Sequence, residues 1–441
     1  MRDDSDYSLQ DAPELPWDRV GASIEAGRAA EYLSREIEES QGRRRALRSA
    51  DRQRLEETTA SVVLALYGAP ADSCGGWRRY GRSRTDYGKP SRYNQSTATL
   101  TTVTTVTDWL IAEGYAENIL GFFRRNPFGG PGGSGSKSRI RATPKLRNLL
   151  EADFGLTPSH VTFALWAETI VLRAAAQEYG GIKHEIDYAE TDETRSFRSK
   201  LQQINESNAK HRISVLMPDG TYKDMPPFRL RRIFNNSSFA FGGRFYGGPW
   251  QGMPAKDRVQ LLIDGEEVVE ADFAAMHPRL IYAIEGSPLD HEADPYALPK
   301  RHGAGQRGYI KQGFQQLLNA GPEATLRKPK TLAGVKLGKG GWTRLLEDIA
   351  TKHRPIARWF RSGRGVELQH IDSEIAEGVL LRMVEQGVCC LPVHDSFIVP
   401  SSQKSLLHQT MQDVYAEVLA SRGCEENDPP ITFHTPTLPH H

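Results

Sequence analysis

The chain of 441 residues is too long for one ordinary domain and predicts two or three. Its 56 Lys and Arg nearly balance 55 Asp and Glu, and it has no uninterrupted apolar run of the ~18 residues that a membrane span needs. The acidic, polar N-terminus lacks the basic start and apolar stretch of a signal peptide, and the four cysteines lack a CxxC spacing. We therefore expect a cytoplasmic protein without a membrane segment, a zinc site or a disulfide framework.

The first predicted region, residues 1–75, is helical. Apolar residues within 22–70 recur at spacings of three and four, as at Ala26, Ala30 and Leu33, which is typical of a helix with one buried face. A run of four arginines in this region is either a basic contact surface or simply a solvated helix face. These arginines are Arg43, Arg44, Arg45 and Arg48.

The second predicted region, residues 76–150, has a large excess of positive charge. Between Trp77 and Arg147 there are thirteen Lys or Arg and only four Asp or Glu. Such an excess attracts a polyanion, so we expect an acidic partner for this part of the chain.

Within this region a Thr-rich stretch has Val103, Val106 and Leu110 at helical spacing, and two short apolar runs then flank a Gly-rich tip. This order resembles a winged helix. The resemblance implies that the helix carrying Thr101 to Thr105 enters a DNA groove and that a basic hairpin lies against phosphates. The hairpin's basic residues are Arg124, Arg125, Lys137, Arg139 and Arg141. The Gly-rich tip is also compatible with a plain linker.

Residues 151–224 have a mostly helical pattern and form a predicted thumb-like segment without catalytic motifs. The sequence becomes chemically informative after it. Val268 and Val269 predict a strand that ends at Asp272, and a helix with Pro278 close to its start follows. A carboxylate at the end of a core strand is open to a cleft, although a single Asp there can equally be a turn or capping residue.

A second carboxylate lies in the segment VCCLPVHDSFIVPSS. Its two apolar runs predict a hairpin whose turn presents Asp395. If this hairpin neighbours the strand of Asp272, the two carboxylates repel each other unless cations bridge them. Two divalent metals about 3.5–4 Å apart suit phosphoryl transfer, and magnesium prefers oxygen ligands. We therefore expect two Mg²⁺ ions at Asp272 and Asp395.

Between these carboxylates the run RGYIKQGFQQLLNAG is predicted to be helical. Arg307, Lys311 and Gln315 fall on one face, and apolar residues form the packed side. Two fixed cations suit a triphosphate, and Lys311 can neutralise leaving pyrophosphate. A basic helix face is otherwise simply solvated.

These segments together resemble the palm and fingers of family A DNA polymerases and of their relatives, the single-subunit phage-type RNA polymerases. GGRFYGGPWQGMP is similar to the family's TGR…NLQNIP element, which puts Arg244 at the arginine near the primer–template minor groove. EADFAAMHPR resembles motif A, with Asp272 as a metal ligand and Arg279 as the closing arginine. The resemblance covers about residues 225–400, with four motifs in the family's order.

The other two motifs imply nucleotide and primer contacts. Arg307 and Lys311 match the R-x3-K of motif B. VHDSF resembles motif C, with Asp395 as the second metal ligand and His394 beside the primer end. LQHIDSEIAEGVLLRM looks like the helix that contacts the template, through Gln369.

Two departures from the family leave sugar selectivity open. His277 stands where motif A usually has a sugar-discriminating Glu, and Asn319 replaces the aromatic expected late in motif B. The HDSF segment is nearer to the phage-type RNA polymerases, whereas Arg279 and the GGR…MP element are nearer to the DNA polymerases.

We expect an α/β (α+β) protein with a right-hand polymerase module at residues 225–441, built from a palm with an antiparallel sheet and helical fingers. The resemblance implies a DNA polymerase that extends a primer with dNTPs. The chain before the palm has no room for both a winged helix and an exonuclease of ordinary size, so we expect no proofreading exonuclease. Its catalytic residues would be Asp272, Asp395 and Lys311, and its nucleotide contacts Arg307, Lys311, His277, Gln315 and Asn319. The alternatives are an RNA polymerase or primase, and a DNA-binding regulator with an inactive palm. The oligomeric state stays open.

Overall fold

The computed structural model describes residues 12–69, 74–87, 91–125, 133–176, 183–217, 220–298, 306–424 and 429–434. The side chains of residues 123–125 and 133–134 lie outside this description. The chain divides into two compact units. Unit 1 comprises residues up to Glu168 with the short segments Tyr222–Arg229 and Gly252–Pro254, and unit 2 comprises the rest.

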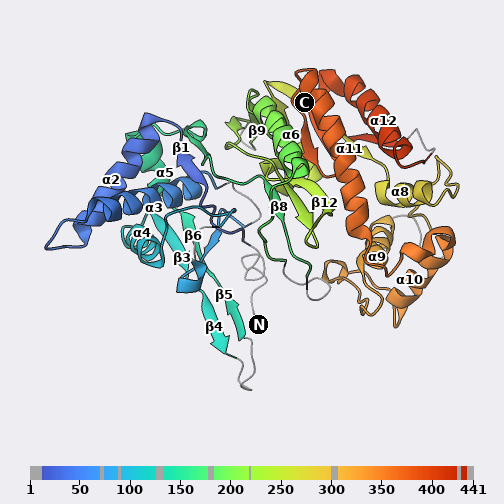
Figure 1. Cartoon of the computed structure of the whole chain (residues 1–441), viewed down its shortest axis with the longest axis horizontal. Coiled ribbons are helices and arrows are strands. Elements are labelled where there is room, and N and C mark those ends of the chain that lie inside the picture. Colours follow the sequence, from blue (N-terminus) through green and yellow to red (C-terminus); the bar gives the residue numbers. More distant parts are fainter. Residues whose placement is uncertain are drawn as a thin grey trace. The chain divides into compact units, whose positions relative to one another are not determined.

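Unit 1 combines helices with short strands (Figure 1). Its helices are α2 (Ile24–Ser40), α3 (Ser49–Tyr67), α4 (Leu100–Ala112) and α5 (Pro144–Asn148). Its strands are β1 (Arg19–Gly21), β2 (Arg78–Tyr80), β3 (Ala116–Ile119), β4 (Phe122–Arg125), β5 (Gly133–Ser136), β6 (Ser138–Ala142), β7 (Val161–Phe163) and β10 (Tyr222–Asp224).

One hydrophobic core joins both predicted N-terminal regions. The helical repeat buries Leu33 of α2 and Val62 of α3, and these pack in one cluster with Val106 of α4 and Ile140 of β6. The expected helices at 22–70 are therefore confirmed, but the boundary expected near residue 75 does not separate two compact units. Apolar residues from both sides of it fill the same interior.

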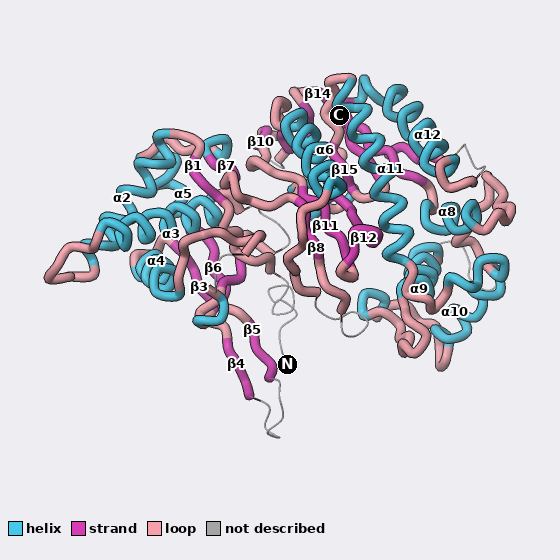
Figure 2. Tube along the Cα trace, in the orientation of Figure 1, coloured by secondary structure: helices cyan, strands magenta, loops and turns pink. Residues whose placement is uncertain are grey.

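Unit 1 contains a three-stranded antiparallel sheet with the order β2-β6-β3, in which β2 precedes α4 in the chain and β3 and β6 follow it. Among the described residues, strands β4 and β5 form a two-stranded sheet of their own and project from this body as a hairpin (Figure 2). Helix α4 starts at a reciprocal cap, in which Thr99 Oγ1 accepts from Thr102 N at 3.2 Å and Thr102 Oγ1 accepts from Thr99 N at 3.0 Å.

Unit 2 contains the longer strands and most of the helices (Figure 1). Its helices are α6 (Asp192–Asn208), α7 (Ala255–Arg258), α8 (Met276–Ile284), α9 (Arg307–Asn319), α10 (Gly341–Lys352), α11 (Gly365–Glu385) and α12 (Lys404–Ala420). Its strands are β8 (Ile170–Leu172), β9 (Ile213–Leu216), β11 (Arg231–Asn235), β12 (Ser238–Tyr246), β13 (Leu261–Ile263), β14 (Glu266–Phe273), β15 (Leu391–Val393), β16 (Ser396–Pro400) and β17 (Ile431–His434).

Strand β14 is the centre of the main sheet in unit 2. It pairs antiparallel with β13, β16 and β17, and β15 continues the sheet beyond β16. Because β14 is covered on both faces, its apolar residues form a nearly continuous run; Val268, Val269 and Ala271 are at most 1% exposed. Helices α11 and α12 lie side by side in this unit (Figure 1).

A second sheet, β12-β11-β8, supports α11. The left-handed backbone of Gly243 (φ +90°) brings β12 so near α11 that an added Cβ would lie 2.7 Å from Ser373 Oγ. Buried Arg232 donates to the carbonyl of Gly243 at 2.9 Å and pairs with Glu377 of α11. These contacts fix the helix that faces the candidate site.

The structure confirms a mixed α+β protein with several mostly antiparallel sheets. Residues 151–224 differ from the mostly helical segment that their sequence pattern predicts. They contain α6 but also β7, β8, β9 and β10, because short apolar runs such as Ile170–Leu172 add edges to sheets formed elsewhere in the chain. In the described part of the chain, no helix has the length and apolarity needed to cross a membrane.

Candidate active site

Strand pairing brings the two sequence-predicted carboxylates together. In the antiparallel register of β14 and β16, Asp272 lies opposite Ser396, the residue directly after Asp395. The backbone N–H of Phe273 donates to the carbonyl of Asp395 at 3.4 Å. Asp272, one residue before the end of β14, therefore lies next to the turn that carries Asp395, as the sequence predicts.

A tight turn presents Asp395. Val393 pairs with Ser396, so only His394 and Asp395 connect β15 with β16. His394 adopts φ +61°, an uncommon conformation for a residue with a side chain, and its ring packs edge-on against Tyr246 at 5.3 Å. Burial, with the charge of Arg244, lowers the pKa of His394 and favours a neutral imidazole beside the carboxylates.

The electrostatics of this pair call for a cation. Burial and the negative charge of Asp395 raise the pKa of Asp272 to about 7, while Lys311 and Arg307 act in the opposite direction. Nearby Glu270 is already satisfied by Arg258, at 2.6 and 2.8 Å, and by Ser396 Oγ at 2.9 Å. Within the described ranges no cluster of three or more His, Cys, Asp or Glu forms a metal site. A cation here would thus rely on Asp272 and Asp395, with other oxygen atoms completing its shell.

Helix α9 carries the predicted cationic face. Arg307 and Lys311 are both exposed, whereas Ile310 and Phe314 on the other side are buried. Their effect on the pKa of Asp272 puts both cations in the electrostatic neighbourhood of the carboxylates. Arg307 Nε donates to Asp294 Oδ2 at 2.8 Å, and its guanidinium lies 5.1 Å from the ring centre of Tyr296.

His277 belongs to a buried hydrogen-bonded network. Its Nε2 lies 2.8 Å from Asp372 Oδ2 and 3.2 Å from Arg244 Nη2, and its Nδ1 is 3.5 Å from Gln315 Nε2. Arg244 Nε donates to both oxygens of Asp372, at 3.0 and 3.1 Å. An Nε2–H tautomer satisfies the carboxylate at one side of the ring and leaves Nδ1 to accept from Gln315.

Asp372 is the main site residue that the sequence reasoning missed. Burial alone would raise the pKa of Asp372, but the hydrogen bond from His277 and the charge and bonds of Arg244 outweigh burial and lower it. Gln369, the residue chosen on the same helix, is half-buried. The sequence signal that could have indicated Asp372 is its position four residues after Leu368, which is buried on the apolar face of α11.

The structure assigns internal contacts to two further predicted residues. Arg279 is 3% exposed and donates to the backbone carbonyls of Ala274, His291 and Ala293 at 2.8–3.2 Å. Its guanidinium therefore holds a loop rather than facing a nucleic-acid surface. Asn319 Nδ2 donates to the Gln315 carbonyl at 2.8 Å and lies one turn after it.

Only some of the basic residues predicted for the hairpin of unit 1 are exposed at the surface. Arg139 is 3% exposed and donates to Ser136 Oγ at 2.6 Å, so the expectation of an open phosphate contact does not fit its position on β6. Arg141 pairs with Glu117 at 2.8 Å and lies 4.8 Å over the ring of Trp77. Arg124 and Arg125 lie on β4, but their side chains are outside the described residues.

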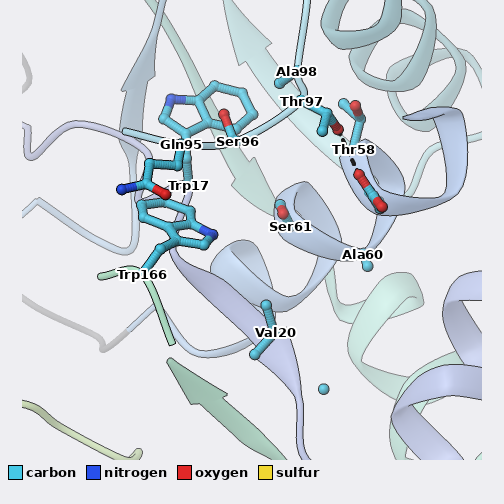
Figure 3. Close-up of a pocket in the computed structure, with 12 residues that line it drawn as sticks. Trp17, Val20, Thr58, Ala60, Ser61, Gln95, Ser96, Thr97, Ala98 and Trp166 are labelled. Carbon is cyan, nitrogen blue, oxygen red and sulfur yellow. Dashed lines mark hydrogen bonds between the residues drawn. The ribbon is translucent and has the colours of Figure 1, made fainter. Parts of the chain in front are cut away.

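Unit 1 also contains a cavity of about 410 Å³ that the sequence does not predict. Figure 3 shows the indoles of Trp17 and Trp166 on one side, near the amide of Gln95. On its other side Thr97 donates to Glu57 at 2.6 Å. This cavity lies outside the carboxylate site and has no catalytic group arrangement.

Comparisons with protein-family models and with curated proteins find no match for this chain.

Proposed function

We propose that unit 2 is a template-directed nucleotidyltransferase, a DNA polymerase that extends a primer 3′-end with dNTPs. The observation that carries this proposal is the adjacent pair Asp272 and Asp395 in the field of Lys311 and Arg307. Two carboxylates that repel each other, facing a cationic helix, suit a reaction in which a polyphosphate chain and divalent cations meet.

The residues fit magnesium. Mg²⁺ usually keeps several waters and is bound through one or two carboxylates together with substrate phosphates, so the two-carboxylate donor set is sufficient. The raised pKa of Asp272 supports this, because a bound cation would relieve the repulsion from Asp395. When bound, the ions would supply charge stabilisation for the attacking and leaving oxygens.

The protein's own residues then have distinct tasks. The primer 3′-hydroxyl gives up its proton to water and attacks the α-phosphate, the bond from that phosphorus to the bridging oxygen breaks, and pyrophosphate leaves. Arg307 and Lys311 on α9 would bind the β- and γ-phosphates and neutralise the leaving charge. The turn at His394 would keep Asp395 fixed against the primer end.

His277 is the candidate for sugar selection. Its ring is 7% exposed and is held from both nitrogens, so it offers a rigid wall rather than a mobile hydrogen-bond donor. This favours the steric exclusion of a 2′-hydroxyl and hence dNTPs. The runner-up, an RNA polymerase or primase, would need Nδ1 of His277 to leave Gln315 and accept from the ribose hydroxyl.

For unit 1 we propose a winged-helix DNA-binding role. The strand order β2-β6-β3, the helix α4 before β3 and the protruding β4–β5 hairpin support this assignment. Thr101 is exposed at the start of α4, where it is free to approach a groove. The excess of basic residues in this region would provide the phosphate attraction.

A primer-extension assay tests the polymerase proposal. The full chain with Mg²⁺ and a primed DNA template should elongate the primer with dNTPs, and NTPs should be poorer substrates. The variant Asp413→Asn, at an exposed acid on α12, serves as a control that should retain activity. Absence of template-dependent elongation with either nucleotide set would reject the proposal.

A further inference from the structure

The segment 287–298, between α8 and α9, is tied to the body of unit 2 through its backbone. Polar side chains from two neighbouring regions donate to its carbonyl oxygens at 2.8–3.1 Å. The donor–acceptor pairs are Arg279 with His291 and Ala293, Lys352 with Asp294, and His353 with Pro295. A loop held in this way can fix the direction of the side chains that it presents.

Asp294 uses this support to hold Arg307 by one nitrogen. Its Oδ2 accepts from Arg307 Nε at 2.8 Å, and the ring of Tyr296 supports the guanidinium at 5.1 Å. The Arg307 side chain is still 53% exposed, and neither of its terminal nitrogens has a hydrogen-bond partner among the described residues. The terminal nitrogens of an arginine are the pair that binds phosphate in a fork, so this contact orients the guanidinium without using that edge.

Tyr296, in the same loop, lies toward the position proposed for the sugar of the nucleotide. Its side chain is 2% exposed and packs edge-on against Phe314 at 5.7 Å, and the next residue of α9, Gln315, interacts with its hydroxyl. Burial, followed by the negative charge of Asp395, raises the pKa of Tyr296. The hydroxyl is therefore neutral and within the field of the catalytic carboxylates, and Gln315 links it to His277.

We propose that two residues of the 287–298 loop belong to the nucleoside triphosphate site, Asp294 as the positioning residue for Arg307 and Tyr296 as the positioning residue for Gln315. The inference rests on the proposed function for the role of Arg307. The two residues have separate roles. Asp294 affects polyphosphate binding by orienting Arg307, and Tyr296 affects sugar selection through Gln315 and His277.

The polyphosphate half is tested by binding of inorganic tripolyphosphate to the full chain, measured by calorimetry. Asp294→Asn keeps the volume but removes the charge that aligns Arg307, and we expect affinity to fall about tenfold through lost orientation. Asp294→Glu should recover part of this loss. Asp290→Asn, an acid of the same loop that caps the backbone of Glu292 at 3.0 Å, is the matched control and should bind like wild type.

A second measurement separates positioning from general damage to the fold. In primer extension, Asp294→Asn should raise KM for dNTPs with a smaller effect on kcat. Tyr296→Phe should alter the dNTP-to-NTP ratio of kcat/KM in the same assay, while its tripolyphosphate affinity should equal that of the wild type. Unchanged or tighter tripolyphosphate binding in Asp294→Asn would overturn the role of Asp294. An unchanged sugar ratio in Tyr296→Phe would overturn that of Tyr296.

These outcomes are distinguishable from failure of the proposed function. A wild-type chain that binds tripolyphosphate but elongates no primer rejects the polymerase, while the comparison of Asp294→Asn with Asp290→Asn still decides the positioning of Arg307. If the wild-type chain elongates primers, and Asp294→Asn does so with the same efficiency as Asp290→Asn, the role of the loop is rejected and the polymerase assignment stands.

Discussion

Asp272 and Asp395 of unit 2 lie at strand ends, whereas Arg139 and Arg141 of unit 1 lie within β6. At the strand ends no Lys or Arg among the described residues is bonded to either acid, and burial together with the negative charge of Asp395 raises the pKa of Asp272 to about 7. Within β6, Arg141 is paired with Glu117 and Arg139 is buried. Like charges at strand ends keep an electrostatic potential that can attract a ligand of opposite charge. Charges inside a sheet are instead neutralised or enclosed by neighbouring residues.

The first test breaks the pair in unit 2. Asp272→Asn or Asp395→Asn removes a proposed metal ligand and almost no volume, so primer extension should fall by about 1000-fold or more, and thermal stability should not decrease. Because the change also relieves repulsion between two half-buried acids, a small rise in melting temperature is expected. Extension by either variant at the wild-type rate would remove the catalytic assignment.

The second test concerns the neighbouring network. If His277 blocks a 2′-hydroxyl, His277→Ala should raise ribonucleotide use by about 10- to 1000-fold, measured as the ratio of kcat/KM for NTP and dNTP. Asp372→Asn should have a smaller effect in the same direction, since it loosens the ring without removing it. A fall in NTP use in His277→Ala would favour the alternative in which His277 accepts from the ribose.

Sequence reasoning predicted Asp272 and Asp395 because strand patterns and turn residues are local signals, and a two-strand register then brings them together. It missed Asp372, whose partners His277 and Arg244 lie 95 and 128 residues away in the chain, and Asp294, whose partner lies 13 residues away on a different element. Asp372 becomes a site residue only when α11 packs against β12 and α8, and Asp294 only when its loop meets α9. Spacing along the sequence carries no trace of such contacts.

Arg139 shows the opposite error. Charge counts across residues 77–147 gave a basic region, but net charge does not say which side chains a sheet encloses. Arg279 gives a similar error. Its match to a sequence motif does not show that its guanidinium donates to backbone carbonyls. The helices of unit 1 were predicted well because each buries one apolar stripe, and that stripe repeats along the chain.

The third test uses pH to examine the contacts that support the 287–298 loop. Burial lowers the pKa of His353 to about 4 from the 6.5 of an ordinary imidazole, and the neutral ring contacts Pro295 O at 3.0 Å and Tyr282 Oη at 3.2 Å. The unfolded chain takes up this proton more readily, so the stabilisation is complete above pH 6.5 and is lost as the pH falls toward about 4. Linkage limits the loss to about 3 kcal/mol.

Urea unfolding of wild type and His353→Gln between pH 4 and 7 measures this contribution as a difference. Glutamine keeps a donor and an acceptor but does not titrate, so its unfolding free energy should fall less on acidification. Parallel pH profiles for the two proteins would show that His353 is not the titrating group.

The smallest effects are expected in unit 1, where the comparison between strand end and strand interior can be sharpened. Arg139 has two buried nitrogens, Nε and Nη1, without hydrogen-bond partners, and it lies opposite Arg79 in the β2–β6 register. Arg139→Met should therefore leave stability unchanged or raise it by up to about 1 kcal/mol, because an unsatisfied buried polar group is costly. It should also leave duplex DNA affinity unchanged.

By contrast, the double variant Arg124→Gln/Arg125→Gln changes a hairpin whose two strands, within the described part of the chain, form a separate two-stranded sheet. If both side chains neutralise phosphates, the slope of log affinity against log salt concentration should become shallower by about 2, with each phosphate contact contributing about 0.9. The full chain is the proper reagent, because the core of unit 1 includes α2 and α3 as well as the basic region. A shallower slope in Arg139→Met, equal to that of the double variant, would mean that the buried arginine reaches DNA and that the contrast between strand ends and strand interiors does not hold.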